Sequence, residues 1–326
     1  QGQRPVTERD VVARLIDVSI GFPANDGTID TVVDRLSLTI RVGERIGLIG
    51  ASGSGKSLTA LSLLGLVPPP GVIVGGSVEI QGTDILPDSV SNQEHLRGGT
   101  VGMVFQEAEA ALNPVMTIGA HLEEMIRRHQ PTQTGRWRRI AVDLLEKVDL
   151  EPIRTLKSHP HRLSGGQRQR ALLAISLAGD PDLIIADEPT SSLDVLTQAR
   201  MLGLLDDLCR ERALALLLIS HDLGVVASLV DRVVVMLAGA IVEEAQTQDL
   251  LEAPLHPYSQ SLVTTARQTG SSKTHPKGHP KSQSGCAYAH HCPRREPECE
   301  QRLPDLTILT GGGAVRCPIV AAEVDQ

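Results

Sequence analysis

LSGGQRQRALLAISLAGDPDLIIADEPTSSLD, residues 163–194, joins a glycine-rich helix start to an acidic strand end. Ser164 is a favourable helix N-cap, and Gln167 stands at the spacing of a capping box. Gly165 and Gly166 leave the first N–H groups of this helix uncovered by side chains. Because the helix dipole adds to those donors, the segment predicts a site for an anion such as a phosphate.

The second half of this segment predicts a buried strand. The run 182–186, which is apolar after Asp182, is too short for a helix and ends directly before Asp187, Glu188 and Pro189. Open α/β sheets bind ligands at the C-terminal edge of their strands. Two carboxylates delivered to that edge predict a metal-bound, negatively charged ligand.

GASGSGKS, residues 50–57, predicts the binding site for such a ligand. It matches the phosphate-loop pattern G-x-x-x-x-G-K-[ST] and follows the strand-like residues 45–49, which is the context that the pattern requires. Its glycines permit backbone turns in which successive N–H groups surround a β-phosphate. Lys56 reaches the β- and γ-phosphate oxygens, and the Ser57 hydroxyl is a Mg2+ ligand. The residues predicted to bind ATP here are Ser52, Gly53, Ser54, Gly55, Lys56 and Ser57.

Over roughly residues 11–260 the sequence resembles the ATP-binding subunits of ABC transporters. LSGGQ at 163–167 resembles the family signature, which in that family completes the ATP site of the opposite subunit in a dimer. LIIADEP at 183–189 resembles the Walker B strand. The resemblance implies that Asp187 lies at the Mg2+ ion and that Glu188 polarises the attacking water.

Four further positions carry the resemblance. Gln106, in VGMVFQ, resembles the Q-loop glutamine, and His221, in LLLISHD, resembles the switch histidine near the γ-phosphate. Residues 192–194 resemble the D-loop. In that family an aromatic residue just after the first strand stacks on adenine; Phe22 is the best match, and ordinary packing is the alternative. The resemblance therefore implies catalytic roles for Glu188, His221 and Gln106, Mg2+ ligation by Ser57, Gln106 and Asp187, and nucleotide contacts from Ser164, Gly165, Gly166 and Gln167.

Composition excludes several other classes of function. The 326 residues carry a formal net charge of −8, which argues against nonspecific binding of nucleic acid. The chain has only five aromatic side chains (one Trp, two Tyr and two Phe), so stacking platforms for single-stranded nucleic acid are not expected. The longest apolar runs, such as 214–219, are too short to cross a membrane. We expect a protein at the cytoplasmic side of the membrane, attached through partners and not bound to nucleic acid.

Alternating strands and helices with ligand groups at the strand ends predict a largely parallel α/β core. The resemblance implies a P-loop NTPase core from residues 1–106 and 164–250, an inserted helical subdomain over 107–163, and a small C-terminal extension over 251–326. Within the insert, 111–118 resembles a segment that grips the membrane subunit in peptide importers. The predicted strands are 11–20, 36–40, 45–49, 77–80, 101–106, 182–186, 215–220 and 232–237, and the predicted helices include 56–66, 121–129, 141–148 and 195–212.

The C-terminal extension narrows the family. LHPY at 255–258 resembles the HPY segment of oligopeptide and dipeptide importers, and residues 270–284 have the composition of a flexible linker. Cys286, Cys292, Cys299 and Cys317 follow, in a spacing that is weak evidence for zinc. A reducing cytosol disfavours disulfides, and four thiolates can bind zinc or an iron–sulfur cluster. The resemblance favours a [4Fe-4S] cluster, with Zn2+ and metal-free thiols as alternatives, because several peptide-importer ATPase subunits carry that cluster on a similar cysteine set.

The resemblance implies an ATPase that powers uptake of di- and oligopeptides. It would act with a second ABC ATPase subunit, two transmembrane permease subunits and an extracytoplasmic peptide-binding protein. The second ATPase would be a related chain, and a homodimer is the alternative. Related importers carry nickel or glutathione. A soluble ABC ATPase that remodels DNA or ribosomes is the alternative from another class, although the tandem halves, coiled-coil insertions and zinc modules usual there are not visible in the sequence.

Overall fold

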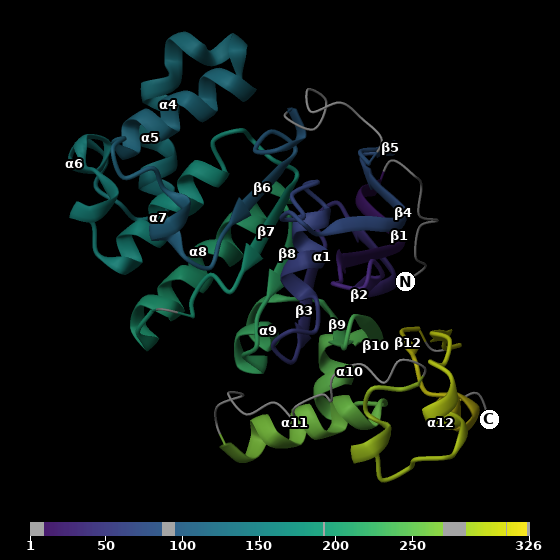
Figure 1. Cartoon of the computed structure of the whole chain (residues 1–326). Coiled ribbons are helices and arrows are strands. Elements are labelled where there is room, and N and C mark those ends of the chain that lie inside the picture. The colour runs from purple at the N-terminus through teal and green to yellow at the C-terminus, as the bar shows by residue number, and fades with distance from the viewer. Residues whose placement is uncertain (1–9, 87–94, 192, 270–284, 311, 325–326) are drawn as a thin grey trace. The chain divides into compact units, whose positions relative to one another are not determined.

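The computed structural model describes residues 10–86, 95–191, 193–269, 285–310 and 312–324 (Figure 1). The chain divides into two compact units. Unit 1 comprises residues 1–13, 40–44 and 80–217, and unit 2 comprises 14–39, 45–79 and 218–326. The predictions for the linker 270–284 and for D-loop residue 192 lie outside the described residues.

Unit 2 contains a sheet with strand order β11-β12-β10-β9-β3. β3 and β9 run parallel, with Gly50 opposite Met236, and β9 is buried along its whole length. Such strands are continuous apolar runs because both faces of a parallel sheet are covered. β10 is antiparallel to β9 and to β12. The strands are β3 (Arg45–Gly50), β9 (Arg232–Leu237), β10 (Ala240–Gln246), β11 (Thr307–Ile308) and β12 (Ala314–Val315).

A second sheet, with order β2-β1-β4, lies almost entirely in unit 2. A turn joins its first two strands: the Ala24 N–H donates to the Thr28 carbonyl at 2.8 Å, and Gly27 has a φ of 83°. The strands are β1 (Val11–Pro23), β2 (Ile29–Arg41) and β4 (Val72–Ile80), and the helices of unit 2 are α1 (Lys56–Ser62), α9 (Leu223–Leu229), α10 (Thr247–Glu252), α11 (Pro257–Thr269), α12 (Glu298–Gln301) and α13 (Pro318–Val324).

Unit 1 places helices beside the parallel pair β6 (Val101–Val104) and β7 (Leu183–Asp187). β8 (Ala215–Ile219), which begins in this unit, lies on the other side of β7. α4 and α5 pack on each other and on α7 (Figure 1). Leu122 and Ile126 of α4 and Leu144 of α5 are buried. The remaining elements are β5 (Thr83–Asp84), α3 (Ala108–Ala111), α4 (Ile118–His129), α5 (Trp137–Lys147), α6 (Pro152–Lys157), α7 (Gly165–Ser176) and α8 (Val195–Arg212).

The predicted α/β class is confirmed, and the structure differs from the prediction most clearly in β2, in α1 and in three strands that were not predicted. β2 begins at Ile29 rather than Leu36, because the turn at 24–28 leads straight into a hairpin. α1 ends at Ser62 rather than Leu66. Gly65, with a φ of 59°, closes that helix in a Schellman motif in which the Leu66 N–H donates to the Leu61 carbonyl at 2.9 Å. The strands β10, β11 and β12 were not predicted, and their antiparallel pairing makes the core less parallel than expected.

Within the described part of the chain, we find no helix that has both the length and the apolar character of a membrane span.

At Gly239, between β9 and β10, the two sheets of unit 2 approach each other closely. It has a φ of 89°, and a β-carbon there would lie 2.1 Å from the Val32 carbonyl oxygen on β2. We expect Gly239→Ala to lower the free energy of unfolding by about 3 kcal/mol or more, since a backbone clash adds to the strain of a positive φ. Urea-induced unfolding measures this change.

Gly27→Ala is the matched control. Gly27 also has a positive φ of 83°, but no atom lies within 4 Å of the added carbon. We expect a loss of about 1 kcal/mol from strain alone. Equal losses in the two variants would contradict the close approach of Gly239 to β2.

Candidate functional site

The predicted site residues fall in both units. The phosphate loop 50–57, Phe22, His221 and the C-terminal cysteines belong to unit 2. Gln106, the signature segment 163–167, Asp187 and Glu188 belong to unit 1. Each set is described within its own unit.

The phosphate loop leaves the C-terminal end of β3 and is organised around Lys56. The Lys56 ammonium is buried and donates to the carbonyl oxygens of Gly50 and Ala51, both at 2.9 Å. Gly53 and Gly55 have φ values of 78° and 98°, which glycine adopts without strain. Two backbone carbonyls at the start of the loop therefore hold the Lys56 ammonium in place.

The hydroxyl groups of the loop differ in their surroundings. Ser52 and Ser57 are exposed, and their contacts with a ligand and a metal ion stay predictions. The Ser54 Oγ is buried, and among the described residues no hydrogen-bond partner is found for it. The Ser54 carbonyl accepts the Gly239 N–H at 3.0 Å, which ties the loop to the β9–β10 turn.

The acidic residues of unit 1 lie where the sequence predicted, at the C-terminal end of a buried strand. Asp187 is the last residue of β7 and is 8% exposed. Glu188 is half-buried and has a φ of 48°. A non-glycine residue with such a φ costs about 1–3 kcal/mol and is found most often at functional sites. The fold therefore maintains Glu188 in a strained backbone conformation directly after the strand.

Gln106 lies at the same edge of the sheet as the Asp187 and Glu188 carboxylates. β6 and β7 are parallel neighbours with Val104 opposite Ala186, so Gln106 and Glu188 each follow the pair by two residues. Gln106 is exposed. The preceding carbonyl, that of Phe105, accepts the side-chain amide of Gln169 from α7 at 3.2 Å.

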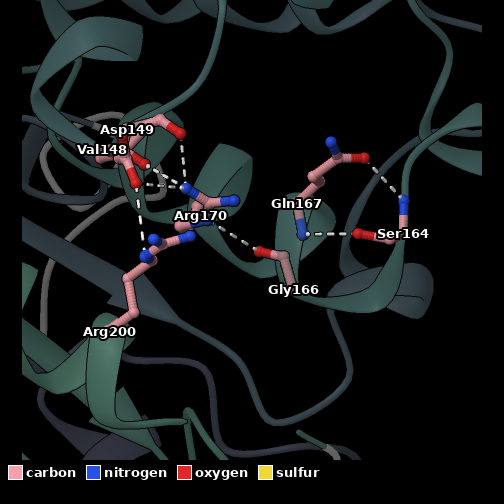
Figure 2. A network of polar contacts seen from close by, with 7 residues as sticks. All are labelled: Val148, Asp149, Ser164, Gly166, Gln167, Arg170 and Arg200. Atoms are coloured by element: carbon pink, nitrogen blue, oxygen red, sulfur yellow. Dashed lines mark hydrogen bonds and ion pairs between the residues drawn. The ribbon is translucent and has the colours of Figure 1, made fainter. Parts of the chain in front are cut away.

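The signature segment forms the predicted capping box at the start of α7 (Figure 2). The Ser164 Oγ accepts the Gln167 N–H at 3.3 Å, and the Gln167 Oε1 accepts the Ser164 N–H at 3.0 Å. Gly165 and Gly166 are the first two helical residues, whose N–H groups have no partner inside an α-helix.

Arg170 fixes this helix to the end of α5 (Figure 2). Its guanidinium donates to the carbonyl oxygens of Val148 and Asp149, and it lies 3.3 Å from the Asp149 carboxylate. Arg200 of α8 lies 3.5 Å from the same carboxylate. Burial lowers the pKa of Arg170 from its ordinary value, against the raising effect of Asp149. Sequence reasoning missed this anchor, although Arg170 stands inside the conspicuous LSGGQ helix.

The two signature glycines have different surroundings. A β-carbon on Gly165 would meet nothing within 4 Å, whereas one on Gly166 would lie 2.4 Å from the Thr197 Cγ2 atom. Thr197 is held in place because its N–H and hydroxyl donate to the Asp194 carboxylate at 3.0 and 2.8 Å. Gly165 leaves open space for a ligand, and Gly166 permits close packing on α8.

His221 follows β8 by two residues and is half-buried. Its position is set on both sides, because the Asp222 N–H donates to the Ser220 Oγ at 3.0 Å and Asp222 caps α9. Phe22 lies near the end of β1 and packs against the loop before β4: a β-carbon on Gly71 would lie 2.8 Å from its ring. This contact supports the packing alternative for Phe22, and its role at adenine stays a prediction.

The C-terminal extension is held by buried polar groups that the sequence did not reveal. The Glu243 carboxylate on β10 accepts the N–H groups of Leu255 and His256 at 2.8 and 2.7 Å. Burial raises the pKa of Glu243 and, with help from the Arg316 charge, lowers the pKa of His256 to about 4. His256 is therefore neutral near pH 7, and its Nδ1 accepts the Tyr258 N–H at 3.1 Å.

The four C-terminal cysteines surround one cavity. Cys286, Cys292, Cys299 and Cys317 line it together with Tyr288 and His256, and none of them is disulfide-bonded in the described chain. Burial raises the pKa of Cys286 and Cys292. The donor set suits a thiolate-bound metal group in its chemistry. Within the described residues, however, no group of three or more His, Cys, Asp or Glu side chains is placed so that it could hold a metal ion.

Comparison with known proteins identifies the family. A family model described as ABC transporter matches residues 33–191, and one described as oligopeptide/dipeptide transporter, C-terminal region, matches residues 242–299. The chain is 40% identical over 304 residues to the oligopeptide transport ATP-binding protein AppD of Bacillus subtilis, covering 89% of this chain and 92% of that protein. The chain belongs to the ABC transporter family.

Two further similarities support this ABC ATPase assignment. The chain is 36% identical over 293 residues to the dipeptide transport ATP-binding protein DppD of Escherichia coli, covering 87% of this chain and 90% of that protein. In structure it is similar to the dimeric ATP-binding cassette MJ0796 bound to ADP and Pi, with a TM-score of 0.63 and 27% identity over 72% of this chain and 98% of that one. The predicted family and ATPase fold are confirmed.

The different surroundings of Gly165 and Gly166 make a testable pair. We expect Gly166→Ala to lower the free energy of unfolding by about 1–3 kcal/mol, because the added carbon meets a Thr197 methyl group that cannot turn away. Gly165→Ala should leave it unchanged or raise it slightly, because alanine is the better helix former. Urea-induced unfolding measures both.

The double variant Gly166→Ala/Thr197→Ser tests the cause. Serine removes the Cγ2 atom and keeps the hydroxyl that donates to Asp194. We expect it to recover most of the lost stability. Absence of rescue would show that the clash with Thr197 does not explain the need for Gly166.

Proposed function

We propose that this ABC ATPase hydrolyses ATP to power the uptake of di- and oligopeptides across the cytoplasmic membrane. One observation carries the proposal: similarity to the oligopeptide protein AppD and the dipeptide protein DppD extends along nearly the whole chain. It includes residues 242–299, which match the C-terminal region of oligopeptide/dipeptide transporters. Importers of nickel or glutathione are the alternative within the family.

The proposed reaction depends on positioning and charge stabilisation, as phosphoryl transfer generally does. The loop 52–57 binds the phosphates, and Ser57, Gln106 and Asp187 hold Mg2+. Glu188 orients the attacking water, and His221 contacts the γ-phosphate. In this scheme residues 1–106 and 164–250 form the ATP-binding core and residues 107–163 the helical subdomain.

The site is proposed to be completed by a second ATPase subunit. The start of α7, Ser164 to Gln167, of which Ser164 and Gly165 are exposed, would contact the terminal phosphate of the partner's nucleotide, and the partner would do the same here. The dimeric state of MJ0796 with ADP and Pi supports this arrangement. ATP can drive transport only if it binds the closed dimer more tightly than the open one.

The remaining partners follow from the importer assignment. We place the chain at the cytoplasmic face of the membrane, bound to two transmembrane permease subunits that receive peptide from an extracytoplasmic binding protein. A related ATPase chain is the proposed second subunit, with a homodimer as the alternative. Copurification with permeases supports this scheme, whereas copurification with DNA or ribosomes would favour the soluble class.

Glu188→Gln tests the reaction. The neutral amide of glutamine cannot accept a proton as a carboxylate can. We therefore expect ATP binding to be retained and hydrolysis to fall about 10²–10⁴-fold. Peptide uptake by the assembled importer should fall with it. Nucleotide titration and phosphate release measure the two steps.

Glu252→Gln is the control, because Glu252 is exposed on α10. Its hydrolysis rate should equal that of the wild type. Wild-type turnover in Glu188→Gln would contradict the role of Glu188, and hydrolysis without any peptide uptake in the assembled importer would contradict the proposed cargo.

We further propose that Cys286, Cys292, Cys299 and Cys317 hold a [4Fe-4S] cluster, with Zn2+ as the alternative. The shared cavity and the four thiol donors support this proposal. When bound, the group would act as a covalent cross-link that fixes the end of the chain. The cysteines would serve as ligands only, and no step of ATP hydrolysis passes through them.

Metal analysis of protein purified without oxygen tests the cysteines. We expect iron and sulfide in equal amounts, and loss of both in Cys292→Ser and Cys299→Ser. Cys209→Ser is the control, because Cys209 lies in α8 and outside the cavity. Zinc alone would establish the alternative, and protein with neither metal would leave four free thiols and refute the proposal.

A further inference from the structure

Tyr258 connects the C-terminal extension to the phosphate loop of the same unit. Its hydroxyl oxygen accepts the Ala51 N–H at 2.9 Å, across 207 positions of sequence, and its side chain is completely buried. The Ala51 carbonyl accepts the Lys56 ammonium at 2.9 Å and the Ser54 N–H at 3.2 Å. Both polar backbone groups of Ala51 are therefore held, the N–H by the extension and the carbonyl by the loop itself.

The position of Tyr258 is itself fixed on several sides. Its N–H donates to the His256 Nδ1, and the Glu243 carboxylate holds the two residues before Pro257. The Tyr288 ring meets the Tyr258 ring edge-on, with centroids 5.5 Å apart. Tyr288 also lines the cavity of the four cysteines. An unbroken series of contacts thus leads from the cysteine cavity to the phosphate loop.

We propose that Tyr258 is a positioning residue that keeps the phosphate loop of its own chain in the form that binds nucleotide. The C-terminal extension then belongs to the ATP site as well as to the end of the chain. This inference rests on the proposed function of the loop. Burial raises the pKa of Tyr258 to about 12, so its hydroxyl stays neutral and the anchor does not vary with pH near neutrality.

The hydroxyl oxygen is the part of Tyr258 that matters here. Phenylalanine would keep the ring and its contact with Tyr288 but would leave the part-buried Ala51 N–H without its acceptor. Removing only one partner of such a hydrogen bond costs more free energy than replacing both partners with apolar groups, because the remaining polar group stays desolvated. The loop should then open more often at Ala51 than elsewhere.

The experiment compares the full-length wild type with Tyr258→Phe and Tyr288→Phe. We expect Tyr258→Phe to speed hydrogen exchange at the Ala51 amide about tenfold, the factor that one hydrogen bond gives. The Kd and KM for ATP should rise by at most about tenfold, the limit that tenfold more frequent opening sets on the fall in the fraction of chains with a competent loop, with kcat changed less than about twofold. Tyr288→Phe makes the same chemical change in the neighbouring ring and should match the wild type.

A merely structural role of Tyr258 gives a different result. Exchange at the amides of β9, which is buried along its length, would then rise as much as exchange at Ala51. That outcome, or unchanged exchange at Ala51 and unchanged ATP affinity, would overturn the inference. Wild-type protein that fails to bind ATP would instead refute the proposed function, while the exchange measurement would still test the anchor.

Discussion

The close approach of β3 to β9 at Gly50 is the constraint on which the phosphate loop depends. A β-carbon on Gly50 would lie 2.1 Å from the Met236 carbonyl oxygen, so no other residue fits this point without moving the strands apart. The loop leaves the sheet directly after it. Lys56 returns to the Gly50 and Ala51 carbonyls, and Gly239, at the end of β9, donates to the Ser54 carbonyl. Strand packing and loop geometry are thus one structural feature.

Unit 1 combines stability and ligand access at the start of α7. The capping box satisfies the Gln167 N–H and the Ser164 N–H and so fixes the direction of the first turn. It leaves the donors of Gly165 and Gly166 available for a ligand. Arg170 then holds the helix to the segment after α5, so the exposed turn stands on a rigid support.

Features with a local cause were predictable from the sequence. The capping box needs residues only three positions apart, and the helix 195–212 and the strand 232–237 have the bounds that their patterns predict. The short apolar run before Asp187 correctly predicted the strand that ends at this residue. The strands β11 and β12 have two residues each, too few for a periodic pattern, and they form because β10 offers an unpaired edge.

Long-range polar contacts could not be predicted for a related reason. Glu243 looks like an ordinary charged residue on a strand, yet it is 1% exposed and accepts two backbone N–H groups 12 and 13 positions away. Tyr258 belongs to the HPY segment that resembles the family, but the sequence of that segment does not predict its hydrogen bond with Ala51. Only the folded chain brings such groups together.

The polar character of these contacts explains why the extension can act on the loop. Apolar packing is non-directional, so an extension held by it alone could slide over the core at little cost. Glu243 and His256 are desolvated groups that keep their hydrogen bonds in one arrangement only, and leaving either unpaired would be expensive. Glu243 and His256 therefore fix the start of α11 and, with it, the position of the Tyr258 hydroxyl. Burying these polar groups costs some stability, but their hydrogen bonds hold Tyr258 in one position. An anchor for a phosphate loop requires such a fixed position.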